Sequence, residues 1–143
     1  MYEPYSRQAL PDKYYRELLG SALCVFNSNN AFIIENILRN DWSGEYSWHD
    51  LIDLESGKLK KSIKDTITLR AGDDIENLFS DLISQRNRII HSFQITKDEK
   101  QVLATKEPQQ LGGKQFIITE DYLLQFIKKN EELSDKLHVL RGF

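Results

Sequence analysis

Arg86, Asn87 and His91 are the residues whose types and spacing best suit catalysis in this chain, and they lie in the segment RNRIIH. An arginine binds phosphate through parallel hydrogen bonds, an amide orients a neighbouring group, and an imidazole titrates near neutral pH. These groups are the ones that metal-free cleavage of a phosphodiester requires. We therefore take the three residues as candidate catalytic residues.

The spacing of these residues restricts how they can meet. On a helix, Asn87 and His91 share one face, whereas Arg86 and His91 lie about 140° apart around the axis and about 7.5 Å apart along it. Arg86 also falls on an apolar stripe, where a guanidinium is costly unless it is paired or reaches a solvated cleft. This conflict between residue and position marks a candidate site.

The element that must position these residues is predicted to be one amphipathic helix over residues 73–93. Asp73 and Glu76 predict a capping box at its start. Its apolar residues recur at three- and four-residue spacing, as on a helix packed against a core; they are Ile75, Leu78, Phe79, Leu82, Ile83, Ile89, Ile90 and Phe93.

Apolar periodicity and N-cap residues predict the other helices. They are a long helix from Lys13 to Arg39 capped by Asp12, a short helix from Ser47 to Leu54, a short basic helix that begins near Lys58, and a last helix from Glu120 to Leu140 capped by Thr119. Residues 27–30 are poor helix formers, so a kink or break there also fits the sequence. Residues 66–72 are expected to connect the basic helix to the next one.

The remaining segments are not helical in pattern. Residues 1–12 show no periodicity and predict an irregular arm. Residues 101–106 and 114–118 predict two strands of a hairpin, joined by a Pro- and Gly-containing loop. The expected fold is therefore mainly α, a single domain over residues 1–143, with four to five helices in an antiparallel bundle and a two-stranded hairpin (101–118) before the last helix.

Two asparagines and a group of basic residues are candidate substrate-binding residues. Asn29 and Asn30 interrupt the apolar face of the first helix; such residues usually hydrogen-bond to nearby backbone, and otherwise line a site. The densest positive patch of the chain is either a solvated face or a surface for phosphates. The basic candidates from this patch and from the RNRIIH segment are Lys60, Lys61, Lys64 and Arg88.

Composition limits the classes of function. A net charge of −3 and a pI near 5.6 give no broad basic surface, so any nucleic-acid binding must be local. The single cysteine, Cys24, excludes an intramolecular disulfide and is expected to be a small core residue. His49 and His138 lie near acidic residues but at no spacing that makes a ligand set, so no metal site is predicted. No signal peptide or run of about 18 apolar residues is present, which leads us to expect a cytoplasmic protein.

The segment Arg86-Asn87-Arg88-Ile89-Ile90-His91 resembles the motif of the HEPN superfamily, small helical domains of prokaryotic toxins and defence nucleases. That motif is Arg, four to six residues of which the first is polar, and then His. The resemblance covers roughly residues 13–93 and the last helix. The hairpin looks like a subfamily insertion of the kind seen in plasmid-borne members.

This resemblance implies a homodimer in which the motif helices of two chains line one cleft, with RNA as substrate and no cofactor. It implies that the 2′-hydroxyl attacks phosphorus, that His91 acts as general base or acid, and that Arg86 stabilises the phosphate charge, with Asn87 orienting His91 or the phosphate. An antitoxin or other regulatory partner is also implied. Members silenced by a nucleotidyltransferase often carry Tyr where this chain has Phe93, so that mode of control is not expected here.

Two other interpretations fit the same residues. One is a HEPN-like dimer that binds RNA, nucleotide or a partner protein without cleavage, which the acidic pI favours. The other is purely structural: Arg86 pairs with an acidic side chain such as Glu35 on the first helix, and His91 is a surface residue.

Overall fold

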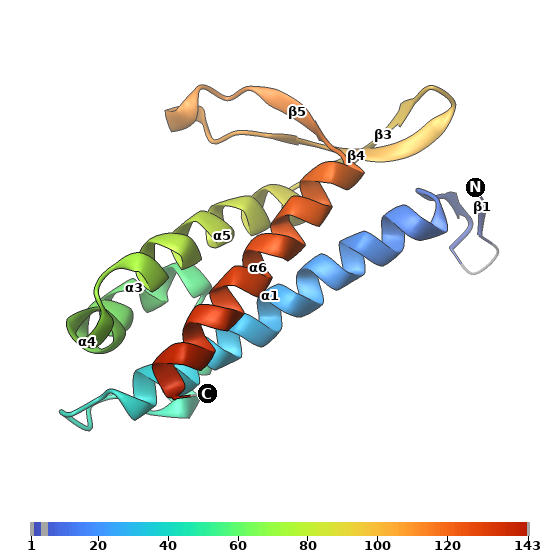
Figure 1. Cartoon of the computed structure of the whole chain (residues 1–143). Coiled ribbons are helices and arrows are strands. Elements are labelled where there is room, and N and C mark those ends of the chain that lie inside the picture. Colours follow the sequence, from blue (N-terminus) through green and yellow to red (C-terminus); the bar gives the residue numbers. More distant parts are fainter. Residues whose placement is uncertain (1, 4–5, 143) are drawn as a thin grey trace.

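Three long helices form the body of the protein, and a small antiparallel sheet lies across one of its ends (Figure 1). The computed structural model describes residues 2–3 and 6–142. The long helices are α1 (Lys13–Arg39), α5 (Asp74–Ile90) and α6 (Glu120–Arg141). The prediction of a mainly helical fold with a small sheet before the last helix is therefore confirmed.

The shorter elements connect the long helices or build the sheet. In chain order they are β1 (Tyr2–Glu3), β2 (Gln8–Ala9), α2 (Trp48–Ile52), the 3₁₀ helix η1 (Ser56–Leu59), α3 (Lys60–Ile63), the π-helical segment η2 (Lys64–Thr68), α4 (Leu69–Ala71), β3 (Phe93–Lys97), β4 (Lys100–Lys106), the 3₁₀ helix η3 (Gln109–Leu111) and β5 (Gln115–Ile118).

Helix α1 begins where its cap predicts and does not break. The Asp12 side chain accepts a hydrogen bond from the backbone N–H of Tyr15 at 2.9 Å. The helix continues through residues 27–30 although these residues are weak helix formers. Phe26 and Ile33, on either side of them, are fully buried. Packing of these neighbours therefore outweighs the low local propensity.

Of the three long helices, α1 and α6 run in the same direction and α5 runs antiparallel to them (Figure 1). At the sheet end, the Tyr15 hydroxyl donates to the Ile118 carbonyl, just before α6, at 2.6 Å. At the other end, Glu35 pairs with Arg141. The expected antiparallel bundle is thus only partly correct, because the chain returns along α5 and crosses the sheet before α6 starts.

The segment between α1 and α5 is more helical than its sequence indicates. Ser47 caps α2 as expected, accepting from the Asp50 N–H at 3.2 Å. The predicted connection at 66–72 is wrong, since η2 and α4 continue the helical path to Ala71. Thr66 fits there because its hydroxyl donates to the Ser62 carbonyl at 2.6 Å. Gly72 then ends the helix at a φ of +85°, which glycine adopts readily.

Helix α5 is shorter than predicted at its C-terminal end. It stops at Ile90, His91 is its C-cap, and Phe93 is the first residue of β3 rather than part of the helix. The Ser92 hydroxyl donates to the Ile89 carbonyl at 2.6 Å, which satisfies one of the free carbonyls at this end. The predicted capping box is also absent: Asp73 makes no side-chain cap, and Glu76 pairs with Lys64 instead.

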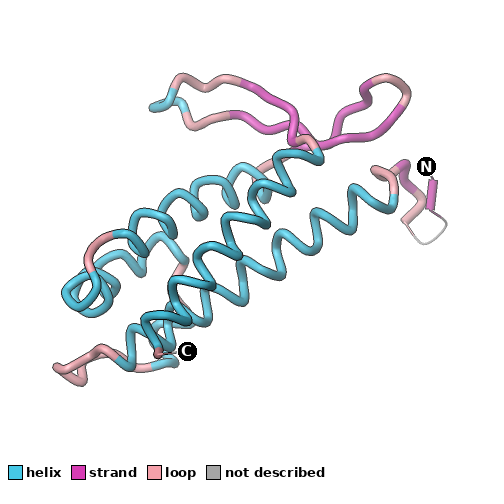
Figure 2. The backbone as a smooth tube through the Cα atoms, viewed as in Figure 1, coloured by secondary structure: helices cyan, strands magenta, loops and turns pink. Residues whose placement is uncertain are grey.

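The sheet has three strands in the order β3-β4-β5, not the two that we predicted. Strand β3 pairs with β4 from Phe93↔Ala104 to Lys97↔Lys100. The two residues of the intervening turn, Asp98 and Glu99, have φ angles of +51° and +65°. Such turns usually contain Asn-Gly or Asp-Gly. Because this turn contains Asp-Glu instead, the sequence does not predict the β3–β4 hairpin. Figure 2 shows the strands gathered at the end where α1 begins.

The sequence predicts an irregular N-terminal arm, but part of it is regular: β1 and β2 form a small antiparallel pair. Residues 1, 4 and 5 of this arm lie outside the described residues. The Gln94 side chain of β3 donates to the Ala9 carbonyl at 2.7 Å and so ties the pair to the sheet.

Cys24 is exposed, and its expected place in the core is wrong. The buried positions of α1 include Ala22 and Phe26. Position 24 is two residues from each, on the opposite side of the helix. None of the helices in the described part of the chain has the length and apolar character needed to cross a membrane.

Candidate functional site

The guanidinium of Arg86 lies against the aromatic core rather than beside an acid. Its Cζ is 4.7 Å from the ring centroid of Phe26, and its Nε and Nη2 donate to the Oδ1 of Asn87 at 3.2 and 2.9 Å. Burial lowers the pKa of Arg86, and the Glu55 carboxylate acts in the opposite direction. An arginine stays charged under these conditions, so the ring face and the amide oxygen hold a partly buried cation.

The suggestion that Glu35 neutralises Arg86 is wrong. Glu35 forms ion pairs with Arg141 at 2.5 Å and with Arg39 at 3.8 Å, at the far end of α1. Within the described ranges 2–3 and 6–142, no carboxylate lies within 4.0 Å of the Arg86 guanidinium. Arg86 therefore keeps hydrogen-bonding capacity for an external anion.

Asn87 and His91 occupy different settings at the end of α5. The Asn87 side-chain oxygen is engaged by Arg86, so this amide orients the guanidinium. His91 is exposed, and its backbone N–H donates to the Asn87 carbonyl at 3.0 Å. Among the described residues, no side chain or backbone group hydrogen-bonds to the His91 imidazole. The imidazole is therefore accessible, and its residue follows by four positions the asparagine whose amide holds Arg86.

Arg88 has a structural role at the same helix end. Its guanidinium donates to the backbone carbonyl of Lys106 in β4, which joins the sheet to α5. The sequence predicts that Arg88 binds substrate, whereas its contact in the structure is with the protein's own backbone.

The two candidate asparagines of α1 differ. Asn29 is buried, and its Nδ2 donates to the backbone carbonyl and side-chain oxygen of Asn130 in α6, at 2.8 and 3.1 Å. It follows the ordinary structural interpretation and joins two helices. Asn30 is half-buried and accepts a hydrogen bond from the Ser56 hydroxyl at 2.6 Å, which holds η1 against α1.

Of the three candidate lysines, Lys60 lines a cavity, whereas Lys61 and Lys64 make ion pairs. Lys61 pairs with Asp65 at 2.8 Å on the surface, and Lys64 reaches Glu76 at 3.5 Å. Lys60 lines a pocket between the η1–α3 segment and α5. Within the described part of the chain, no carboxylate lies within 4.0 Å of its ammonium.

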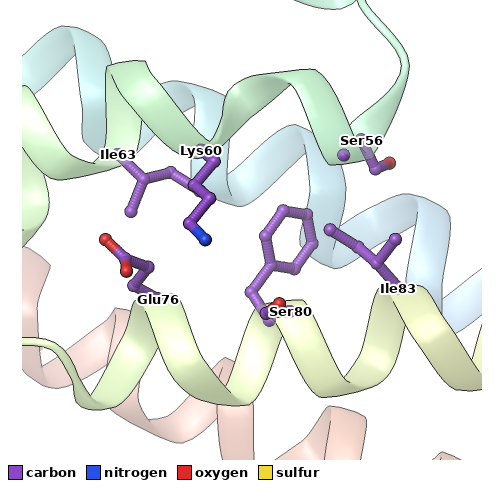
Figure 3. A pocket seen from close by; sticks show the side chains of 8 residues that line it. Ser56, Lys60, Ile63, Glu76, Ser80 and Ile83 are labelled. Carbon is purple, nitrogen blue, oxygen red and sulfur yellow. The ribbon is translucent and has the colours of Figure 1, made fainter. Parts of the chain in front are cut away.

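The pocket beside Lys60 offers both charged and apolar groups. Its empty space is about 350 Å³, part of it open to solvent, and the residues that line it are Ser56, Gly57, Lys60, Ile63, Glu76, Phe79, Ser80 and Ile83. Figure 3 shows the Lys60 side chain and the Glu76 carboxylate entering this space from opposite walls. Glu76, Ser80, Ile83 and Asn87 follow at spacings of four, three and four, so the pocket and Asn87 share one face of α5.

Several residues of this region had no functional interpretation in the sequence. The sequence predicts Glu76 only as part of a helix cap and assigns no role at a site to Phe26 or Ser56. Each contact that gives them a place at the site joins segments far apart in the chain, such as Phe26 with Arg86. A local sequence pattern cannot predict a contact between residues that are far apart in the chain.

The described residues contain no group of three His, Cys, Asp or Glu side chains that could hold a metal ion. His138 instead packs edge-on against Phe32, with ring centroids 4.7 Å apart. Comparisons of the chain with protein-family models, with curated proteins and with solved structures found no match.

Proposed function

We propose that this protein is a metal-independent endoribonuclease of the HEPN type. The observation that carries the proposal is the Arg86–Asn87 pair. The Arg86 guanidinium is fixed by an aromatic face and an amide, and no carboxylate lies within 4.0 Å of it among the described residues. The exposed His91 follows Asn87 by four residues on the same helix. A fixed cation beside a titratable group suits phosphoryl chemistry.

In the proposed reaction the RNA 2′-hydroxyl attacks the adjacent phosphorus. The new bond joins the 2′-oxygen to phosphorus, and the bond from phosphorus to the 5′-oxygen breaks. His91 takes the hydroxyl proton or supplies the proton that the 5′-oxygen needs, while Arg86 stabilises the charge on the phosphate oxygens. The products are a 2′,3′-cyclic phosphate and a 5′-hydroxyl, and DNA is inert because it lacks the 2′-hydroxyl.

The proposal includes a homodimer formed through α5, so that two copies of the motif share one cleft. Ile90 and Phe93 support it, because both are large apolar side chains, 49% and 45% exposed, on either side of His91. In this proposal the protein is a cytoplasmic toxin or phage-defence effector, and an antitoxin or another regulatory protein restrains it.

The test is incubation of the purified protein with RNA in EDTA. The proposal expects cleavage in the chelator and a loss of at least about 100-fold in rate for His91→Ala and for Arg86→Ala. His49→Ala is the matched control, since His49 is also an exposed histidine near a helix end. Full activity in both motif variants would remove the assignment.

A dimer that binds RNA, nucleotide or a protein without cleavage is the second candidate. The exposed imidazole favours it, because a catalytic histidine is usually oriented by a second group and none of the described residues hydrogen-bonds to His91. RNA binding by gel shift without any cleavage product, across several RNAs, would decide for this candidate.

A further inference from the structure

The pocket between η1–α3 and α5 has a chemistry that the proposed reaction does not use. Its charged groups are the ammonium of Lys60 and the carboxylate of Glu76, a residue that is only 8% exposed. A carboxylate is rarely buried to this degree unless its oxygens are hydrogen-bonded or serve a ligand.

The existing contacts of Glu76 leave part of its capacity free. One oxygen accepts from the Thr68 hydroxyl at 3.2 Å, and the other pairs with Lys64 at 3.5 Å. An ionised carboxylate has about four acceptor positions. One position on each oxygen therefore remains for two parallel donors from a ligand.

The walls of the pocket suit a flat ring. Ile63 and Phe79 are each 1% exposed, and Ile83 continues the apolar surface along α5. The cavity itself measures about 80 Å³, below the usual range of about 300–1,000 Å³ for ligand pockets, and the wider space of about 350 Å³ includes open solvent. The pocket can thus take at most one edge of a single base, with the rest of the ring in the open part of the space, and not a folded oligonucleotide.

The order of polar groups selects among the bases. Guanine presents two neighbouring N–H donors, at N1 and N2, beside the O6 acceptor. The carboxylate of Glu76 can accept from both donors while Lys60 donates to O6. Uracil has one N–H between two carbonyls, and adenine and cytosine place an unprotonated ring nitrogen next to the amino group, where it would face the carboxylate.

The pocket is also placed to serve the candidate catalytic residues. Its last lining residue on α5, Ile83, lies about 6 Å along the axis from Asn87 on the same face. A nucleotide whose phosphate contacts Arg86 can therefore direct its base into the pocket.

We propose that this pocket binds a guanine base, namely that of the nucleotide next to the cleaved phosphodiester. The position of the guanine in RNA rests on the proposed ribonuclease function, whereas guanine binding itself does not. The wall from α3 supplies Lys60, the wall from α5 supplies Glu76, and the bound ring lies between Ile63 and Ile83.

The experiment titrates the full chain with guanosine 5′-monophosphate and, separately, with the adenosine, cytidine and uridine monophosphates, by calorimetry. The guanosine nucleotide is expected to bind at least about tenfold more tightly than the other three. Lys60→Ala should weaken it by about tenfold, and Glu76→Gln should abolish the preference because a carboxamide cannot accept at both positions.

Lys58→Ala is the matched control, because Lys58 is an exposed lysine of η1 that does not line the pocket. Lys60 is exposed and, within the described residues, has no carboxylate within 4.0 Å, so its removal leaves the fold intact even if Glu76→Gln unfolds. Equal affinity for the four nucleotides, absence of binding at millimolar concentration, or equal weakening by Lys58→Ala and Lys60→Ala would overturn the proposal.

Cleavage of RNA of defined sequence separates the two proposals. Binding of guanosine monophosphate without RNA cleavage would contradict the proposed ribonuclease function and support the proposed guanine pocket. RNA cleavage without a preference for sites next to guanine would contradict the proposed role of the pocket in cleavage and support the proposed ribonuclease function.

Discussion

The guanidinium of Arg86 lies over the ring of Phe26, with 4.7 Å between Cζ and the ring centroid. Phe26 in turn stacks with Phe79 of α5 and Phe126 of α6, at centroid distances of 5.8 and 6.2 Å. The Arg86 guanidinium, on the apolar stripe of α5, therefore packs against the aromatic cluster at the centre of the fold. This arrangement explains how the core tolerates the charge and gives the guanidinium a rigid support.

Arg86→Met tests whether the arginine is present for function rather than stability. Methionine keeps an apolar contact with Phe26 and removes the cost of a partly buried charge, so the free energy of unfolding should change by no more than about 1 kcal/mol. RNA cleavage should be lost. Urea denaturation and the cleavage assay measure the two effects, and Phe26→Ala, expected to cost about 3–5 kcal/mol, sets the scale for a structural residue.

A loss of stability above about 2 kcal/mol in Arg86→Met, on the same scale, would instead make Arg86 a structural residue.

Local signals in the sequence located the helices because their determinants are local. Asp12 and Thr119 cap α1 and α6 as predicted, each accepting from a backbone N–H three residues on. Strand β3 escaped prediction because Phe93 continues the helical spacing of α5 and because the Asp98-Glu99 turn lacks the usual glycine. Tertiary pairing with β4 decides the conformation of that segment.

The candidate site was only partly visible for the same reason. The neighbours Arg86 and Asn87 could be singled out from a six-residue pattern, and their hydrogen bonds join adjacent residues. The aromatic support of Arg86 and the partner of Arg88 come from distant segments, which a single sequence does not bring together. Glu76 looked like a cap because its true partner, Lys64, belongs to another helical segment.

Asn29→Ala should weaken the packing of α1 on α6 without an effect on catalysis. The substitution removes a buried amide that donates to Asn130, and should cost about 1–3 kcal/mol of unfolding free energy. Asn27→Ala is the control, because Asn27 is exposed on the same helix and alanine favours helix formation there. If the Asn29→Ala variant folds but no longer cleaves RNA, Asn29 has a role in the functional site.

Arg88→Ala should loosen the sheet. The amides of β4 that pair with β5 should exchange with solvent about tenfold faster, because the charged hydrogen bond to the Lys106 carbonyl is gone. Lys106→Ala keeps that carbonyl and should leave exchange unchanged. The salt dependence of RNA binding distinguishes the alternatives: a smaller slope in Arg88→Ala would assign Arg88 to phosphate contact.

Tyr15→Phe should reduce stability at neutral pH and alter its alkaline limit. The Tyr15 hydroxyl donates to the Ile118 carbonyl and accepts from the Leu103 N–H, so its loss should cost about 1–2 kcal/mol. Burial raises the pKa of Tyr15 above its ordinary value of 10.0. Its contribution is therefore complete below pH 10 and is lost as pH rises through the folded-state pKa.

Urea denaturation across this pH range measures the Tyr15 effect, with the exposed Tyr14→Phe as control. The difference in stability between wild type and Tyr15→Phe should be constant up to about pH 10 and shrink above it. A difference that grows with alkaline pH would contradict the raised pKa.

Ile90→Glu and Phe93→Glu test the proposed dimer. Both side chains are about half exposed and flank His91, so a carboxylate there should place like charges in an interface formed through α5. Light scattering should report a monomer, and RNA cleavage should fall with it. Leu69→Glu and Val139→Glu are matched controls, since these residues are 80% and 73% exposed and precede the start of α5 or lie near the end of α6, away from the motif. A wild-type monomer that cleaves RNA, or dissociation by the control substitutions alone, would contradict a dimer through the motif helices.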